Sequence, residues 1–365
     1  RVARPGAGGV VAAGLALGRP SFLESPFMLY TLHAATHALM APSSAWWLQC
    51  ARWLRESPTP GAREFSASLE VLSRLTRDYP KPSFGIEGVR EWVQKSTPFC
   101  VLRGFESPGS PPDAPTVFVV APMSGHHATL LRDTVKALAQ ANRVFITDWV
   151  SADAVPLEKG PFGLDDYVAT VRRFWDHLGA SSLHVLAVCQ PVVPVLAAAA
   201  LNARSGHANP ATLTLMGGPV DARQGLTDVT HLATAHPLSW FQTWLIHSVP
   251  WPKMGWGRPV YPGFLQHAGF MALNPSRHRQ AQWDFFNALT RGMEEPAEAH
   301  RRFYDEYNAV ADLPAEFYLD TIRVVFQEHL LPRGLWEVAG HRVDLAALKT
   351  PLLTLEGSRD DISGP

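Results

Sequence analysis

Short, continuous apolar runs alternate with amphipathic segments through the middle of the chain. The runs are rich in β-branched residues and have the length of buried strands, whereas the segments between them carry apolar residues at helical spacing. Strands that are apolar on both faces belong to parallel sheets covered by helices on both sides, and right-handed crossovers make such a sheet doubly wound. The pattern therefore predicts an α/β fold, with strands at 116–122, 143–149, 183–189, 211–218 and 351–357 and helices at 127–141, 164–179 and 191–206.

Two long stretches depart from this alternation. The residues between Gly218 and the last strand, roughly 130 in number, are rich in aromatic residues and histidine and mostly helical in pattern. They are too many for a plain loop, so they predict a cap or lid inserted late in the sheet. The stretch from 29 to 56 has apolar residues at helical spacing, broken at Pro42, and predicts helices packed on the main domain. The alternative is a helical surface that contacts an apolar partner or polymer.

These changes of pattern divide the chain into five expected segments. The first methionine is Met28, and we expect the residues before it to be an upstream leader outside the native structure, with a signal peptide as the alternative. A proline- and serine-rich break at 104–115 precedes the first core strand. The expected segments are the leader 1–27, an N-terminal helical region 28–103, the first part of the core 104–221, the cap 222–349 and the continuation of the core 350–365.

Composition and charge narrow the possible functions. Of the 365 residues, 46% are hydrophobic and 18% charged, and the formal net charge is -1, which argues against wholesale disorder and gives no electrostatic case for a nucleic-acid partner. The three cysteines, Cys50, Cys100 and Cys189, are odd in number and far apart, so neither a disulfide framework nor a metal site is expected, and a reducing cytosol fits. No apolar run approaches the length of a membrane span, so an integral membrane protein is not expected.

Cys189 stands at the carboxyl end of a predicted strand, immediately before a predicted helix. A nucleophile at such a turn is pushed out over the sheet, and the helix N-terminus favours a thiolate and an oxyanion. The usual frame is G-x-S-x-G, and here it is Ala187-Val188-Cys189-Gln190-Pro191. Position alone leaves two interpretations open, a catalytic nucleophile or a small, inert core residue.

An oxyanion hole needs a second backbone donor from the loop after an earlier strand. The segment 121–133, "APMSGHHATLLRD", is in that place, so the backbone of Met123 or Ser124 is expected to supply one N–H and that of Gln190 the other. His126 and His127 lie at the start of the following helix. They either cap and solvate this helix or contact the substrate.

The acid of a triad is expected in the late segment "LLTLEGSRDDIS", where Asp360 or Asp361 follows the last strand. A solvated acidic loop is the alternative. No histidine follows in the order nucleophile, acid, base that this arrangement requires, so we expect the base to lie beyond the end of the chain, which looks truncated just after the acid. Asp148, at another strand end, is expected to cap or hydrogen-bond a local turn.

Several longer motifs together resemble the intracellular polyhydroxyalkanoate (polyhydroxybutyrate) depolymerases. They include "MLYTLHAATHALMAP", "VAPMSGHHATLLRDTV", "VLAVCQPVVPVLAA", "VYPGFLQHAGFMALNP" and "LEGSRDDISG", and the similarity runs from Met28 to about Gly364. The resemblance implies an α/β-hydrolase fold with a large helical cap, Cys189 as nucleophile, and Asp360 as first choice for the acid. It also implies a histidine in a later segment that this chain lacks.

The same resemblance implies hydrolysis of ester bonds in the amorphous polyester of cytoplasmic storage granules, through a thioester on Cys189. No metal or bound cofactor is implied, and water or coenzyme A is the acyl acceptor. The aromatic cap would grip the polymer, and His126, His127 and Trp240 are candidate substrate contacts.

Three other functions are compatible with parts of the pattern. A polyhydroxyalkanoate synthase also uses a cysteine on this turn, but synthases favour a G-x-C-x-G frame, from which "AVCQP" departs. A non-catalytic granule-binding protein would lack a complete triad. A generic soluble esterase would act on short esters and would not bind granules.

Overall fold

The computed structural model describes residues 26–111, 113–225, 227–358 and 360. Their contacts form two compact units. One comprises the chain up to Asp78 together with Leu265–Arg301, and the other comprises Tyr79–Phe264 together with the chain from Arg302 onward. Of the expected leader, 1–27, residues 1–25 lie outside the described part, whereas a helix already begins at Pro26, so the expected boundary is two residues too late.

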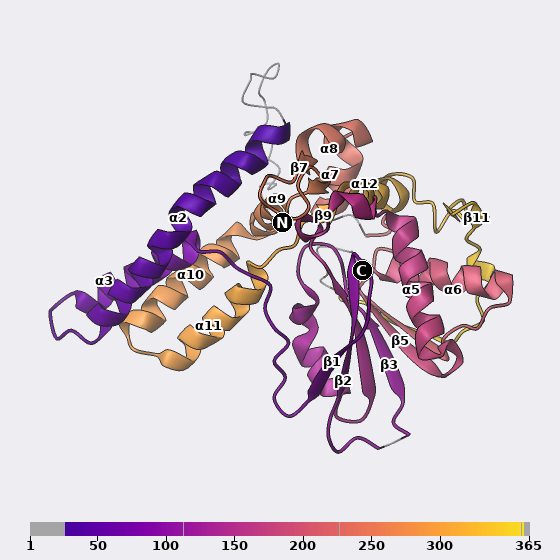
Figure 1. The fold of residues 1–365 in the computed structure, drawn as a ribbon, viewed down its shortest axis with the longest axis horizontal. Coiled ribbons are helices and arrows are strands. Elements are labelled where there is room, and N and C mark those ends of the chain that lie inside the picture. The colour runs from indigo at the N-terminus through magenta and orange to yellow at the C-terminus, as the bar shows by residue number, and fades with distance from the viewer. Residues whose placement is uncertain (1–25, 112, 226, 359, 361–365) are drawn as a thin grey trace, which may run out of the picture. The chain divides into compact units, whose positions relative to one another are not determined.

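The secondary structure follows the predicted order over most of the chain (Figure 1). The helices are α2 (Pro26–Arg55), α3 (Ala62–Thr76), α4 (Arg132–Leu138), α5 (Leu164–Leu178), α6 (Val192–Ser205), α7 (Asp228–Ala235), α8 (Leu238–Leu245), α9 (Gly263–Leu273), α10 (Pro275–Thr290), α11 (Glu294–Tyr307) and α12 (Ala315–Thr321), which continues as a π-helix over Ile322–Gln327. The strands are β1 (Arg90–Ser96), β2 (Cys100–Glu106), β3 (Thr116–Val120), β4 (Arg143–Trp149), β5 (Leu183–Val188), β6 (Thr212–Met216), β7 (His247–Ser248), β8 (Pro259–Tyr261), β9 (Leu313–Pro314), β10 (Glu337–Val338), β11 (His341–Arg342) and β12 (Leu352–Leu355).

A seven-stranded sheet forms the centre of the second unit, in the order β1-β2-β4-β3-β5-β6-β12. β2 is antiparallel to both of its neighbours, and all pairs from β4 to β12 are parallel. This order, with β4 between β2 and β3 and with an antiparallel second strand, is that of the α/β-hydrolase fold. The fold class predicted from the sequence is therefore confirmed.

Both faces of this sheet are buried, as the continuous apolar runs predict. Because successive side chains of a strand point to opposite faces, Phe118 and Val120 of β3 join the core under α5 and α6, while Val119 joins a second cluster with Val135 of α4. Figure 1 shows α5 and α6 beside one another along the sheet. The sheet is thus a rigid platform whose parallel strands all end at one edge.

Two strands fall inside the segment expected to be helical, so that expectation for 28–103 is wrong in its second half. The helices end at Thr76, and β1 and β2 already belong to the sheet. β1 is an edge strand exposed at five of its seven positions, and the apolar run of β2 is interrupted by Arg103 and Gly104. Neither strand therefore shows the continuous apolar run on which the prediction relied.

α2 continues through Pro42, where the sequence predicted a break. Proline removes one backbone N–H from the helix. The hydroxyl groups of Ser43 and Ser44 donate to the carbonyl oxygens of Met40 and Ala41, at 2.6 and 2.7 Å, and so hydrogen-bond carbonyl groups in the turn that precedes the proline. The loss of one bond is too small to end a 30-residue helix that packs along α3.

α2 and α3 pack through small side chains rather than through the large apolar ones. Ser66 and Ser73 of α3 donate to the carbonyl oxygens of Ala51 and Ser44, which lets the two helices approach closely. Four large residues spaced seven apart on α2 are instead exposed by 60–81%, namely Leu32, Leu39, Trp46 and Trp53. The expectation that this helix packs on the main domain is therefore not met at these four positions, which are open to solvent.

The expected single cap over 222–349 is also divided. Its central part belongs with α2 and α3, because α10 packs on α3 and Arg301 pairs with the buried carboxylate of Glu70 at 2.8 Å. The rest stays in the second unit. There the backbone N–H of Gly263 donates to the carboxylate of Asp312 at 2.8 Å, next to the points where the chain leaves this unit and returns to it.

Candidate active site

Cys189 adopts a backbone conformation that is rare for a residue with a side chain. Its φ angle is 68°, between the end of β5 at Val188 and the start of α6 at Val192. A positive φ is unfavourable for non-glycine residues and persists only where the surroundings enforce it, which happens often at functional sites. The backbone N–H of Cys189 donates to the carbonyl oxygen of Met216 at 2.6 Å, and its own carbonyl oxygen accepts from Val192 N–H at 3.1 Å. The geometry is that of a sharp strand-to-helix turn with Cys189 at its apex.

Two glycines after β6 leave the room that this turn needs. A Cβ on Gly218 would lie 2.3 Å from Cβ of Val192 and 2.8 Å from the carbonyl oxygen of Cys189, so any side chain there collides with the turn. Gly217, with φ +56°, precedes it. In the G-x-S-x-G frame the small residues flank the nucleophile, whereas here Pro191 occupies the second of those places. The space beside the Cys189 turn is instead provided by Gly218, whose steric role the sequence did not predict.

The predicted oxyanion loop faces this turn. The backbone N–H of Met123 points to the side-chain oxygen of Gln190, with 3.4 Å between the two atoms, and both residues are buried. The loop that follows β3 and the residue that follows Cys189 are therefore in contact, as predicted. Ser124 is half-buried in the same loop.

Three hydrogen bonds hold the backbone of Ala121, the first residue after β3 and the start of this loop. Its N–H donates to the hydroxyl of Thr147 at 2.9 Å. Its carbonyl oxygen accepts from the indole N–H of Trp149 at 2.8 Å and from the hydroxyl of Tyr167 at 3.1 Å. Sequence reasoning missed all three side chains, and the only indication of them was the Trp that ends a predicted strand.

Asp360 lies at the same edge of the sheet. β6 and β12 are parallel neighbours, and the Gly217 N–H donates to the carbonyl oxygen of Leu355 at 2.9 Å. A Cβ on Gly217 would lie 3.4 Å from Oδ2 of Asp360, so the carboxylate stands beside the glycine pair that touches the Cys189 turn. The alternative acid, Asp361, is outside the described residues, and the structure tests no histidine as the base.

The two histidines of the oxyanion loop have different surroundings. Nε2 of His126 is 3.1 Å from the carbonyl oxygen of Tyr307, and the two rings are 5.0 Å apart, so His126 links the loop to the segment after α11. Burial, together with the nearby charge of Lys81, lowers the pKa of His127 to about 4. His127 does not cap the following helical turn with its side chain, and its buried Nδ1 has no hydrogen-bond partner in the described structure. The alternative that His127 caps this helix is therefore wrong.

Trp240 belongs to an aromatic cluster on α8. Its ring stacks on His236 at 4.2 Å and meets Phe241 edge-on at 5.1 Å. It is partly buried against the main core. Its role as a substrate contact stays a prediction.

Asp148 is fully buried and binds two cations, so the expectation of a local turn contact is wrong. Lys81 Nζ lies 2.5 Å from one carboxylate oxygen and Arg103 Nε 2.6 Å from the other. Buried charges need such partners, because an unpaired carboxylate in the core is strongly unfavourable. Burial and the Asp148 carboxylate also raise the pKa of the neighbouring Cys100 thiol well above its ordinary value.

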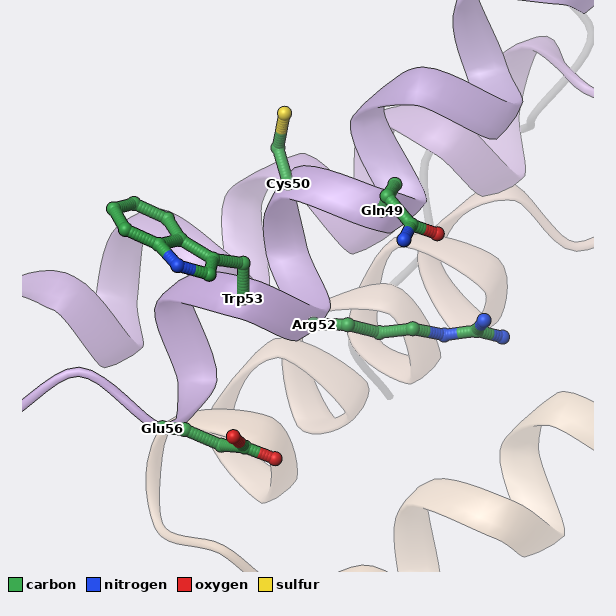
Figure 2. A pocket seen from close by; sticks show the side chains of 5 residues that line it. All are labelled: Gln49, Cys50, Arg52, Trp53 and Glu56. Carbon is green, nitrogen blue, oxygen red and sulfur yellow. The ribbon is translucent and has the colours of Figure 1, made fainter.

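Other site types have little support in the described part of the chain. No group of three or more His, Cys, Asp or Glu side chains is placed to hold a metal ion among the residues that the structure describes. None of the described helices has the length and hydropathy that a membrane span requires. An open hollow of about 490 Å³ on α2 is lined by Gln49, Cys50, Arg52, Trp53 and Glu56. Figure 2 shows these five side chains.

Comparison with known proteins agrees with the motifs. Residues 217–365 match the family described as PHB de-polymerase C-terminus, the family that the sequence motifs resemble. No curated protein was found to match the chain.

Several solved structures are similar to part of the chain. They include a candidate esterase from Staphylococcus aureus (12% identity, TM-score 0.33, covering 49% of this chain and 64% of that one). An esterase of the bacterial hormone-sensitive lipase family has 14% identity and a TM-score of 0.31, covering 53% of this chain and 62% of that one. EstE5 has 15% identity and a TM-score of 0.31, covering 55% of this chain and 68% of that one. The chain thus covers less than two thirds of the length of the first two, and the fold assignment rests on the strand order.

Proposed function

We propose that this protein, a member of the PHB depolymerase family over residues 217–365, hydrolyses ester bonds of poly(3-hydroxybutyrate) or a related polyhydroxyalkanoate. The observation that carries the proposal is the positive φ of Cys189 at the turn between β5 and α6. Such a turn presents one side chain above the carboxyl edge of the sheet, and the thiol is a strong nucleophile once it loses its proton. The proposed place of action is the surface of a polyester granule in the cytoplasm.

In the first half of the proposed reaction, the thiolate of Cys189 attacks an ester carbonyl carbon and forms a C–S bond. The carbonyl oxygen becomes an oxyanion, which accepts hydrogen bonds from the backbone N–H groups of Met123 and Gln190. The C–O bond to the leaving alcohol then breaks, and the thiol proton, held meanwhile by a histidine base, passes to the departing alkoxide. Asp360 orients this base.

In the second half, water attacks the thioester. The same base takes a proton from the water, and a second tetrahedral oxyanion forms at the same donors. The C–S bond breaks, the Cys189 sulfur regains the proton, and a 3-hydroxyacid end is released. Coenzyme A as acceptor would follow the same path and leave a 3-hydroxyacyl thioester. No bound cofactor takes part in either path.

The loop geometry supports this assignment of the oxyanion donors. In the structure the Met123 N–H is directed at the side-chain oxygen of Gln190, a neutral acceptor, 3.4 Å away. An oxyanion formed on the Cys189 adduct would compete for this donor as the stronger acceptor. The bonds from Trp149 and Tyr167 to Ala121 hold the loop in place meanwhile, so the donors need little reorganisation during the reaction.

The test uses the full-length protein and its Cys189→Ala variant, each incubated with amorphous poly(3-hydroxybutyrate) particles. We expect release of 3-hydroxybutyrate, or of its coenzyme A ester when coenzyme A is supplied, by the first protein only. A matched variant, Cys50→Ala, removes a cysteine of the other unit and should keep full activity. Equal release by the Cys189→Ala variant would refute the nucleophile, and no release by any of them, with polymer binding intact, would favour a synthase or a coat protein.

A further inference from the structure

A tight turn of the second unit exposes three large apolar side chains within six residues. In residues 250–257, named here the tryptophan turn, Trp251 is 77% exposed, Met254 70% and Trp256 64%. Isolated apolar residues on a surface are ordinary, whereas large exposed apolar side chains gathered in one short turn point to an interaction site.

The tryptophan turn is rigid. Within it, Lys253 N–H donates to the carbonyl oxygen of Pro250 at 3.2 Å and Trp256 N–H to that of Lys253 at 3.0 Å. Gly255 N–H donates to the carbonyl oxygen of Asp153 at 2.8 Å, and a Cβ on Gly255 would lie 2.7 Å from the carbonyl oxygen of Ala152. The turn is thus fitted closely onto the segment after β4, and its side chains are displayed without a large loss of backbone freedom on binding.

The base of the turn is held by a buried arginine. The guanidinium of Arg258 donates to the carbonyl oxygens of Val155, Pro156 and Gly160, at 2.9, 2.5 and 2.7 Å. Arg258 is 1% exposed, and Val249 N–H donates to its carbonyl oxygen at 2.9 Å. Arg258 therefore connects the segment after β4, through its guanidinium, to Val249 just before the turn, through its backbone carbonyl group.

The tryptophan turn carries no uncompensated charge. Its one charged residue, Lys253, forms an ion pair with Asp153 at 2.5 Å. Surfaces that dock on anionic bilayers or nucleic acids present free Lys and Arg side chains around their apolar residues. A neutral apolar turn instead complements an uncharged, water-insoluble partner.

The turn is anchored at the sheet edge where Cys189 lies. Ala152 and Asp153 follow the carboxyl end of β4, and Cys189 follows that of β5, with β3 between the two parallel strands. Neighbouring strands are about 4.8 Å apart, so the ends of β4 and β5 are separated by roughly 10 Å. A polymer that touches the turn would therefore meet the protein on the side of the nucleophile.

We propose that the tryptophan turn is the surface by which this protein docks on uncharged polyester, with Trp251 and Trp256 as its anchors. This inference rests on the proposed function for the identity of the polymer. Docking is separate from bond cleavage, because none of the exposed side chains of the turn belongs to the Cys189 site.

The first test measures binding in the Cys189→Ala background, by co-sedimentation with amorphous poly(3-hydroxybutyrate) particles. We expect Trp251→Ser with Trp256→Ser to raise the apparent Kd at least tenfold. Trp251→Phe with Trp256→Phe should keep most of the affinity, because aromatic area is preserved. The matched control is Trp46→Ser with Trp53→Ser on α2, which removes two tryptophans exposed by 64% and 74% and should leave binding unchanged.

Equal or greater loss in the α2 control, or no loss in the turn variant, would overturn the inference. So would binding to phosphatidylglycerol vesicles as tight as binding to the polyester, since that would make an anionic membrane the partner. A second readout separates the inference from the proposed function. If full-length protein binds particles through the turn but releases no product, the function fails and the docking surface stands. If it releases product equally well with or without the two tryptophans, the function stands and the docking surface fails.

Discussion

The backbone N–H of Cys189 donates a 2.6 Å hydrogen bond to the carbonyl oxygen of Met216, the last residue of β6. This bond extends the ladder between β5 and β6 by one residue beyond the strands. It holds the cysteine in its unfavourable conformation while the sheet supplies the stability. Cys189 is therefore positioned by a neighbouring strand as well as by its own.

The positive φ of Cys189 predicts that a glycine at this position makes the protein more stable than an alanine does. Glycine accepts a positive φ without a steric penalty, so Cys189→Gly should unfold with a free energy about 1 kcal/mol higher than Cys189→Ala, although neither variant has a nucleophile. Urea unfolding followed by circular dichroism gives both values. A lower stability for the glycine variant would show that the backbone at this turn is not strained.

Gly218 should be intolerant of any side chain. In Gly218→Ala the new methyl group collides with Val192 and with the carbonyl oxygen of Cys189, so the turn must move. We expect a loss of at least tenfold in kcat/KM, because catalytic geometry tolerates little displacement. Gly269→Ala in α9, where a Cβ meets nothing within 4 Å, is the matched control and should be active and equally or more stable. Unaltered activity in Gly218→Ala would contradict the assigned role.

The three cysteines should differ in reactivity toward iodoacetamide. Cys100 is fully buried, and burial together with Asp148 raises the pKa of its thiol, so at pH 8 it should stay unmodified in the folded protein. Cys189 should be alkylated with parallel loss of ester hydrolysis, whereas alkylation of Cys50 should leave the rate unchanged. Peptide mapping by mass spectrometry after graded labelling assigns each site. Inactivation that follows modification of Cys100 instead would refute the nucleophile assignment.

His127 predicts a pH dependence of stability below neutrality. Burial lowers its pKa to about 4 in the folded protein, while the unfolded chain titrates near the ordinary value of 6.5. Between these values the unfolded chain binds a proton that the folded one does not, so the free energy of unfolding falls as the pH drops from 6.5 to 4. The full effect is about 3 kcal/mol.

The measurement is urea unfolding at pH 7 and pH 5, for the natural protein and for His127→Gln. The variant should show a smaller loss of stability between the two pH values, because its side chain does not titrate. Equal losses in the two proteins would mean that His127 is not buried in its neutral form.

The parts of the fold that the sequence predicts are those with local periodic patterns. β4 begins and ends at the predicted residues, and β3, β5, β6 and β12 lie within the predicted runs. β1 and β2 were not predicted. β1 is mostly exposed and carries charged residues, and the apolar run of β2 is interrupted by Arg103. β7, β8 and β9 have two or three residues each and exist only through pairing between segments far apart in the chain.

In the candidate site, too, the residues with a local sequence pattern were predicted, and those that depend on contacts between distant segments were not. Cys189, Met123 and Gln190 could be placed because the ends of parallel strands meet at one edge of a sheet. The ligands of Asp148 could not, since Lys81 and Arg103 approach it from distant positions and leave no pattern at the aspartate. The steric role of Gly218 is equally hidden, because it depends on how closely β6 approaches the helix after the nucleophile.

The hydrogen bond from Gly263 N–H to Asp312 joins the two segments of the second unit that flank the helical insertion. The chain leaves the second unit after Phe264 and returns at Arg302, and the fastened pair lies just outside these two crossings. β8 and β9 pair at Tyr261 and Leu313 beside this bond, so the two ends of the insertion are held as neighbours. A segment whose ends are neighbours can be accommodated without separating the strands on either side of it.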